Sequence, residues 1–207
     1  MDRNNTLKHE GDALVWLPEL GMGYHTAEAM SYQEDYWQKY QVMDDSDMGE
    51  ALTQARIDFV RKNYDGLVVD IGIGAGRFVE EIGGLGFDVN EHAIAWLESR
   101  NRFCDPYRFS VRAITCWDSL EHITKPEDLI AQAEEWVFVS MPIYKGGEHV
   151  LKSKHYRPGE HLWYWTREGL IKWFFRNGFN LISSSDFETE IGREEIESFA
   201  FHRFKHV

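Results

Sequence analysis

The sequence predicts an α/β fold with a doubly wound, mostly parallel sheet of the seven-stranded Rossmann-like type, and three observations support this. Short apolar runs alternate with amphipathic segments from about residue 48 onward, as expected when helices cover both faces of a parallel sheet. A glycine-rich turn directly follows the apolar run at 67–71. The last two apolar runs, near 179–185 and 196–204, predict a C-terminal antiparallel hairpin.

The individual elements follow from periodicity and from local stop signals. Apolar runs predict strands at 67–71, 85–89, 112–117 and 136–141. Helical spacing predicts a short helix after the glycine-rich turn and longer helices at 32–40, 48–64, 91–100, 126–135 and 167–177. Thr166 is the expected N-cap of the last helix, and Gly178 ends it.

Two regions are harder to assign. Residues 1–30 show no clear period, so we expect residues 1–47 to form an N-terminal lid or extension and residues 48–207 to form the main domain. Between Asp88 and the strand at 112, a helix and a third strand must share about two dozen residues. We therefore expect the third strand to be short or missing.

Composition bounds the class of protein. The chain has 207 residues, 43% of them hydrophobic, which suits one well-buried core. Cys104 and Cys116 allow at most one disulfide, and the sequence shows no paired metal-ligand spacing, so we expect a reducing cytoplasmic location and no metal site. No secretion signal is visible, and no apolar stretch approaches the roughly 18 residues of a membrane span.

Charge argues against extended binding to nucleic acid. The net charge of −13 repels a polyanion. The segment 145–157 is locally basic, with Lys145, Lys152, Lys154 and Arg157. It is either a solvated loop or a segment that captures an anionic substrate.

The glycine-rich turn indicates a ligand that lies against bare backbone. A dinucleotide-binding fingerprint requires a third glycine at position 77, which is Arg77 here. An aspartate, Asp88, ends the next strand and is placed to accept both hydroxyls of a ribose. This combination favours an adenosyl ligand without phosphates over a tight turn with no ligand. The candidate cofactor-binding residues of this region are Asp70, Gly72, Gly74, Gly76 and Asp88.

Further candidates follow the later strands. Trp117 and Asp118 end a strand at the expected ligand edge of the sheet, where they contact a ligand or cap the chain locally. The pairs Glu121-His122 and Glu160-His161 either serve a substrate or fix their loops.

Four segments together resemble the class I S-adenosylmethionine-dependent methyltransferases. These are "DIGIGAG" at 70–76, "GFDVNEHAI" at 86–94, "ITCWDSLEHITKPEDL" at 114–129 and "RPGEHLWYWTREGLIKWFFRNGF" at 157–179. With "FETEIGREEIESFAFHRF" at 187–204, the chain is similar to phage and bacterial members of small-molecule type. The resemblance implies S-adenosylmethionine as the cofactor and a small-molecule, sugar or nucleotide-like acceptor.

For the transfer itself, a base must take a proton when the acceptor is a hydroxyl or a protonated amine. We favour His161, with His122 and His155 as alternatives and Glu160 beside them. Arg56 either meets the methionine carboxylate of the cofactor or forms a surface ion pair. The aromatic residues Tyr32, Tyr36, Trp37 and Tyr40 either cover the sulfonium or pack as the apolar face of a helix.

Two other functions compete with this one. The first is a non-catalytic binding module on a methyltransferase fold. The second is a nucleic-acid methyltransferase, which needs a basic face that only the segment 145–157 offers. The sequence also lacks the Asn/Asp-Pro-Pro-aromatic signature of many amino-methylating enzymes. Where that signature would stand, the strand ends in Trp117, Asp118 and Ser119.

Overall fold

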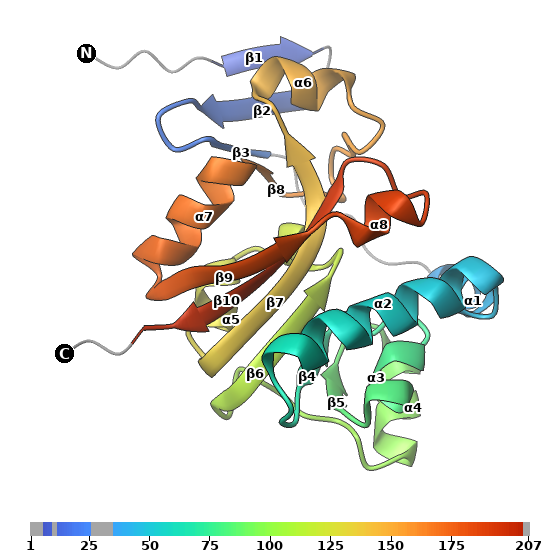
Figure 1. Cartoon of the computed structure of the whole chain (residues 1–207). Helices are drawn as coiled ribbons and strands as arrows, with labels where there is room; N and C mark the ends of the chain where they lie inside the picture. Colours follow the sequence, from blue (N-terminus) through green and yellow to red (C-terminus); the bar gives the residue numbers. More distant parts are fainter. Residues whose placement is uncertain (1–5, 10–11, 26–34, 205–207) are drawn as a thin grey trace.

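The computed structural model describes residues 6–9, 12–25 and 35–204 (Figure 1). Its strands are β1 (Thr6–His9), β2 (Asp12–Leu17), β3 (Met22–His25), β4 (Val69–Ile71), β5 (Leu85–Phe87), β6 (Val111–Trp117), β7 (Ala133–Tyr144), β8 (Trp163–Thr166), β9 (Phe179–Ser185) and β10 (Ile196–Arg203). Its helices are α1 (Asp35–Asp44), α2 (Asp47–Asn63), α3 (Arg77–Ile82), α4 (Glu91–Ser99), α5 (Pro126–Ile130), α6 (Gly147–Lys152), α7 (Arg167–Arg176) and α8 (Phe187–Glu190), with a 3-10 turn at Leu120–His122.

The strands form one mixed sheet with a parallel centre. Strands β5, β4, β6 and β7 lie side by side in that order and run parallel. The hairpin β9–β10 continues the sheet antiparallel to β7. The last residues of β7 also pair with β8, and β3, β2 and β1 extend the sheet from there. The expected α/β fold with its C-terminal antiparallel hairpin is confirmed.

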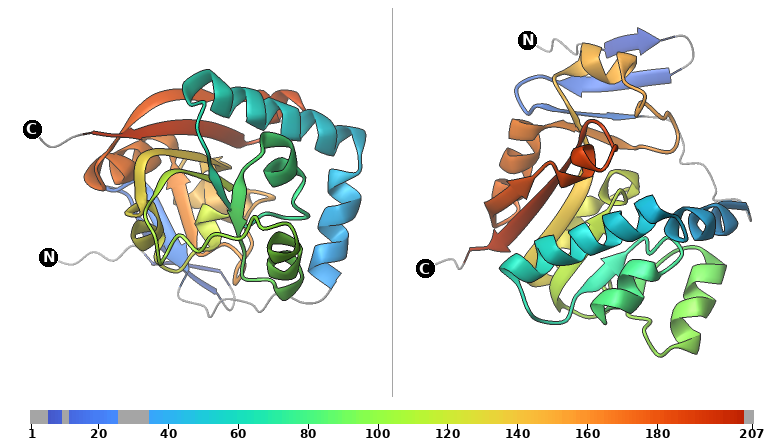
Figure 2. Two further views of the ribbon diagram at one scale, coloured as in Figure 1. Left: turned by 90° about the horizontal axis from the view of Figure 1, so that it is seen from below. Right: turned by 45° about the vertical axis from the view of Figure 1, so that its right-hand side comes forward.

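Both faces of the parallel centre are buried because successive side chains point to opposite sides. In β7, Val137, Val139 and Met141 pack in the cluster that holds α5 and α7, whereas Phe138 packs with α2 and α3. Figure 2 shows α2 (teal) and α7 (orange) apart, with the ribbon of β10 (red) between them. The helices are therefore fixed to the sheet by two separate apolar layers.

Several local expectations are confirmed and one helix is shorter than expected. The Thr166 hydroxyl accepts a hydrogen bond from the Gly169 N–H at 3.0 Å, so it caps α7 as predicted. The helix expected at 126–135 ends at Ile130, because Ala133 already pairs with Val111 in the sheet. Tertiary pairing overrides the helix propensity of Ala133 and the two glutamates after it.

One further strand was not expected from the sequence, and the third strand is as short as expected. The aromatic residues 163–165 and Thr166 form β8, which bridges β7 to the N-terminal strands. The third strand is reduced to a single bridge between Gly86 and Phe103 within the described part of the chain, as its short spacing predicts. The division at residue 47 stays a prediction, although β1–β3 join the sheet and α1 lies next to α2.

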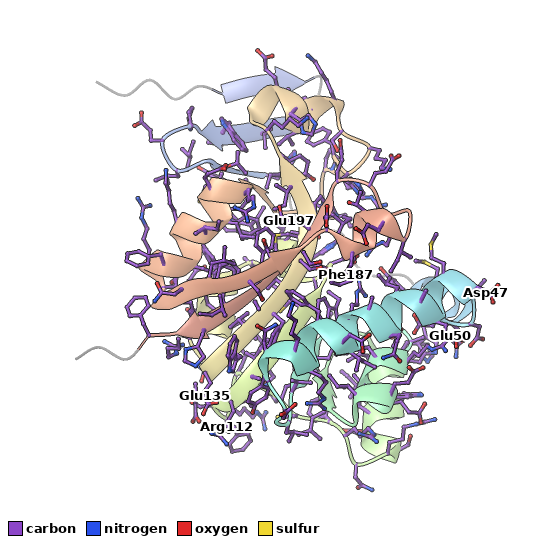
Figure 3. All side chains as sticks on the ribbon, in the orientation of Figure 1. Asp47, Glu50, Arg112, Glu135, Phe187 and Glu197 are labelled. Carbon is purple, nitrogen blue, oxygen red and sulfur yellow. The ribbon has the colours of Figure 1, made fainter. Side chains whose placement is uncertain are left out.

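The two ends of the parallel strands have different roles. At the amino ends of β6 and β7, Arg112 and Glu135 form an exposed ion pair (Figure 3). Such a pair contributes little to stability. The loops at the opposite, carboxyl ends enclose the cavity described next. Among the described residues, no helix is long and apolar enough to cross a membrane.

Candidate functional site

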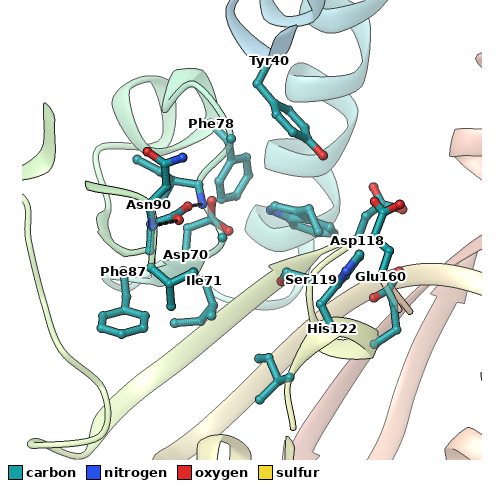
Figure 4. Close-up of a pocket in the computed structure, with 18 of the residues that line it drawn as sticks. Tyr40, Asp70, Ile71, Phe78, Phe87, Asn90, Asp118, Ser119, His122 and Glu160 are labelled. Carbon is teal, nitrogen blue, oxygen red and sulfur yellow. Dashed lines mark hydrogen bonds between the residues drawn. The ribbon is translucent and has the colours of Figure 1, made fainter. Parts of the chain in front are cut away.

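A cavity of about 900 Å³ lies at the carboxyl ends of β4, β5 and β6 (Figure 4). This is the edge where ligands bind in open α/β sheets. Helices α1 and α2 line one side, and the loops that follow β6 and α6 line the other. The volume is sufficient for a ligand of cofactor size.

The glycine-rich turn forms one wall of this cavity. Gly72 and Gly74 line it with φ of +75° and +57°, a backbone region that residues with a Cβ rarely adopt. A Cβ at Gly72 would lie 2.9 Å from the Ser119 Cβ, and one at Gly74 would lie 3.2 Å from Cδ1 of Tyr40. The absence of side chains at these positions therefore permits this backbone conformation and keeps this wall of the cavity open.

Gly76 has a different role from the other two glycines. It has a φ of +93° at the N-cap of α3, and it is not among the residues that line the cavity. A Cβ there would lie 2.6 Å from the Trp96 ring. The structure thus explains Gly76 by helix entry and packing against α4.

Asp88 closes the turn from the next strand. Its carboxylate accepts hydrogen bonds from the Ile73 N–H at 2.9 Å and from the Asn90 N–H at 2.8 Å, drawn as dashed lines in Figure 4. Burial raises the pKa of Asp88, and the two amide bonds oppose that rise. Because each carboxylate oxygen has further lone pairs, Asp88 still has acceptor capacity on the cavity, which it lines.

Asp70 lies deeper, in the middle of β4, with only 2% of its surface exposed. The Thr115 hydroxyl donates a hydrogen bond to it at 2.6 Å. Burial raises the pKa of Asp70 from 3.8 to about 7; Thr115 and the Arg56 charge oppose the rise, and Asp88 and Asp44 add to it.

We expect Asp70→Asn to change how stability depends on pH. The raised pKa means that the charged form is disfavoured in the folded chain, so wild type loses stability as the pH rises from about 4 to about 7. A shift of about three units corresponds to roughly 4 kcal/mol. Urea unfolding should therefore give similar stabilities for the two proteins at pH 4 and a more stable variant at pH 8. A constant difference between these pH values would contradict the shift.

Trp117 and Asp118 also line the cavity, so their contact with a cofactor stays a prediction, and Asp118 is already engaged by other side chains. Its carboxylate lies 3.0 Å from Nη2 of Arg56 and 2.8 Å from Nη1 of Arg193. These two cations lower the pKa of Asp118 despite its burial. The Arg56 guanidinium also lies 5.1 Å from the centre of the Trp117 ring.

Glu188 completes a buried network with these charges. It has no exposed side-chain surface, and it accepts from Nε of Arg56 at 2.9 Å and from Arg193. We call Arg56, Asp118, Glu188 and Arg193 the ion network. Sequence reasoning anticipated an ion pair at Arg56 but placed it on the surface, and it missed Arg193 and Glu188. Neither has a motif of its own, and both reach the site only because the segment after β9 folds back over β7.

The acceptor candidates gather at the other end of the cavity. The rings of His122 and His161 meet edge to face with centroids 4.8 Å apart, and the Glu121 carboxylate lies beside them. Burial lowers the pKa of both histidines, that of His161 to about 3, and raises that of Glu121 well above its usual range. Glu160 lines the same region and pairs with Arg157 at 3.2 Å.

The basic segment 145–157 contributes less than its charge suggests. His155 and Arg157 line the cavity, whereas Lys152 and Lys154 are not among its lining residues. Lys154 instead forms an exposed pair with Glu194 at 2.9 Å. The expected contact of these two lysines with a substrate therefore has no support in the geometry of the cavity.

The aromatic helix meets the cavity in part. Trp37 and Tyr40 line it from α1, opposite the glycine turn. Tyr32 falls outside the described residues, and for Tyr36 only the backbone is described. Tyr40 is the labelled side chain above the cavity in Figure 4.

Comparisons with known proteins agree on one fold. A family model described as a methyltransferase domain matches residues 36–184. No curated protein sequence matches the chain significantly. The chain is similar to the solved structure of a magnesium protoporphyrin IX methyltransferase from Synechocystis with bound S-adenosylhomocysteine, with 15% identity, a TM-score of 0.55 and coverage of 84% of this chain and 90% of that one.

Two other solved structures have comparable likeness. One is a possible histamine N-methyltransferase from Thermotoga maritima, with 13% identity, a TM-score of 0.59 and coverage of 83% and 98%. The other is a 1,6-didemethyltoxoflavin N1-methyltransferase from Burkholderia thailandensis, with 13% identity, a TM-score of 0.55 and coverage of 96% and 98%. At these levels of sequence identity, the similarity to the solved structures shows a shared fold.

Proposed function

Because the chain belongs to the methyltransferase domain family, we propose that it transfers a methyl group to a small-molecule, sugar or nucleotide-like acceptor. The chain is a methyltransferase, and S-adenosylmethionine is its cofactor. When bound, this cofactor supplies a methyl group already activated on a sulfonium. The protein then needs mainly to bind the two reactants and to orient them.

The observation that carries the proposal is that one cavity joins two chemically different ends. The bare glycine backbone and Asp88 form the first end, and Glu121, His122 and His161 form the second. The first end fits an adenosyl group, because no side chain at Gly72 or Gly74 narrows it. An acceptor at the second end would lie in the same cavity as the donor.

The chain's own residues take distinct roles in this proposal. Asp88 accepts the ribose hydroxyls, and Gly72 and Gly74 admit the adenosyl group against the backbone. Trp117 lines the cavity with the Arg56 guanidinium over its ring, and this cation–π contact helps to hold Arg56 beside the ligand. Asp70, held by Thr115, supports the turn from behind.

His161, His122 and Glu160 face the acceptor. A buried imidazole with a pKa of about 3 is a weak base near neutral pH, so we assign His161 to holding the acceptor. Glu160 is partly exposed, with 30% of its side-chain surface accessible, and it connects this end of the cavity with solvent. A small acceptor also suits the net charge of −13, which disfavours a polyanion.

Calorimetry with S-adenosylhomocysteine tests the proposal. We expect one molecule to bind each chain and to raise the melting temperature. At 100 times the dissociation constant, the ligand should add about 2.7 kcal/mol of stability. A folded protein that gives neither heat nor a thermal shift at millimolar ligand would instead favour the non-catalytic binding module.

Asp88→Ala locates the ligand within the cavity. Loss of hydrogen bonds to a charged acceptor should weaken binding by about 1.5–3 kcal/mol, or roughly 10- to 150-fold. Thermal unfolding serves as the control, because the variant also loses the bonds from Ile73 and Asn90. Wild-type affinity in a folded variant would show that the ribose lies elsewhere.

A further inference from the structure

The second end of the cavity holds three potential metal-binding side chains, each with at least one buried ligand atom that has no hydrogen-bond partner among the described residues. One ligand atom from each of Glu121, His122 and His161 can be chosen so that all three lie within 4.8 Å of one another. Glu121 and His161 are only 2% and 5% exposed. Neither carboxylate oxygen of Glu121 accepts a hydrogen bond from another described residue, and Nδ1 of each histidine has no partner among them.

Unpaired burial of such groups is costly. Burying a carboxylate without hydrogen bonds costs several kcal/mol. Of two adjacent buried imidazoles, each disfavours the protonated form of the other. The chain nevertheless brings them together firmly, because the Leu162 N–H donates to the Glu121 carbonyl at 2.8 Å. That bond links the 3-10 turn after β6 to Leu162, which lies between His161 and the strand β8.

The orientation of His122 suits a metal ligand. Its Nδ1 is buried and has no hydrogen-bond partner among the described residues, and the Glu160 backbone carbonyl favours a proton on the ring. A ring nitrogen without a partner can offer its lone pair to a cation, and a carbonyl at the other nitrogen is the usual arrangement of metal-binding histidines.

We propose that Glu121, His122 and His161 bind one divalent transition cation at the acceptor end of the cavity. Two imidazoles and a carboxylate suit Zn²⁺, Mn²⁺ or Co²⁺ better than Ca²⁺ or Mg²⁺, which prefer oxygen ligands. Three protein ligands leave at least one coordination position open, as in catalytic zinc sites. All three residues line the cavity, so that position faces the space assigned to the acceptor.

Binding requires the three ligand atoms to move closer together. With bonds of about 2.0–2.2 Å, the ligands of a tetrahedral ion lie roughly 3.4 Å apart, so a separation of 4.8 Å must contract by about 1.4 Å. This inference rests on the proposed function, which supplies the class of methyl acceptors. Within that class, the metal site favours acceptors with an oxygen or nitrogen that can bind a cation.

Titration with Co²⁺ tests the site, because the visible absorption of this ion reports its ligands. The protein is first treated with a chelator and dialysed. We expect saturation at one equivalent in wild type, and at least a tenfold loss of affinity in His161→Ala and in Glu121→Gln. The matched control is His149→Ala, since His149 pairs with Glu195 away from this cavity and should leave Co²⁺ binding unchanged.

The test separates this proposal from the proposed function. Calorimetry with S-adenosylhomocysteine is run on each protein with and without Co²⁺. A wild type that binds S-adenosylhomocysteine but not Co²⁺ overturns the metal site and leaves the methyltransferase function standing. Equal Co²⁺ affinity in wild type, His161→Ala and Glu121→Gln also overturns it.

An NMR measurement on the wild type tests the site even if the variants do not fold. In the wild type, substoichiometric Mn²⁺ should broaden the imidazole NMR signals of His122 and His161 before those of His149 and His202. Uniform broadening of all histidines would mean that the ion binds only the acidic surface, and the proposal would be wrong.

Discussion

Gly74→Val should abolish binding of S-adenosylhomocysteine, with a loss of affinity of more than about 100-fold. Gly74 has a φ of +57° on the wall of the cavity, and even a bare Cβ there would lie 3.2 Å from Tyr40. A β-branched side chain resists this backbone region and would project toward the ligand's space. The measurement is calorimetry, combined with urea unfolding to establish that the variant folds.

The chain contains a matched control for backbone strain. Gly83 has a φ of +73° at the end of α3, it is outside the cavity lining, and a Cβ there would meet nothing within 4 Å. Gly83→Val should therefore cost similar backbone strain, about 1–2 kcal/mol, and keep wild-type affinity. If both variants lose binding equally, then the stability of α3 and its turn, rather than the space at Gly74, controls the site.

The parallel centre of the fold is predictable because its signals are local. The buried run at 67–71, the N-cap Thr166 and the strands of the C-terminal hairpin each depend on neighbouring residues, and each appears where expected. The N-terminal strands are different. They exist through pairing with β8, which lies some 140 residues away in the chain, and no short-range pattern at 6–25 reports that pairing.

The candidate site also contains residues that local sequence predicts and residues that only long-range contacts bring together. The glycine turn and Asp88 are recognisable because one strand, one turn and the next strand place them together within twenty residues. The contact between His122 and His161 depends on how β8 returns to the 3-10 turn, and their sequence spacing matches no metal motif. For this reason sequence patterns predict no metal site, whereas the side chains of the folded chain suggest one.

Two members of the ion network, Glu188 and Arg193, were missed by sequence reasoning, and breaking this network should have the largest effect on stability. Glu188 is fully buried and balances Arg56 and Arg193 together with Asp118. Glu188→Gln keeps the shape of the side chain but leaves two guanidinium groups with one carboxylate. Breaking a buried pair in this way costs about 3–5 kcal/mol, because a charge remains buried without compensation.

Urea unfolding at neutral pH measures this loss, and Glu194→Gln is the control. Glu194 forms an exposed pair with Lys154 at a distance of 2.9 Å, equal to that between Glu188 and Nε of Arg56, so the two variants differ mainly in burial. We expect little change for Glu194→Gln. Because the network joins α2 to the segment after β9 across the cavity, Glu188→Gln should also weaken binding of S-adenosylhomocysteine. If the Glu188→Gln protein is as stable as Glu194→Gln, then solvent or Asp118 alone compensates the charges of the two guanidinium groups. In that case the network does not hold this wall of the site.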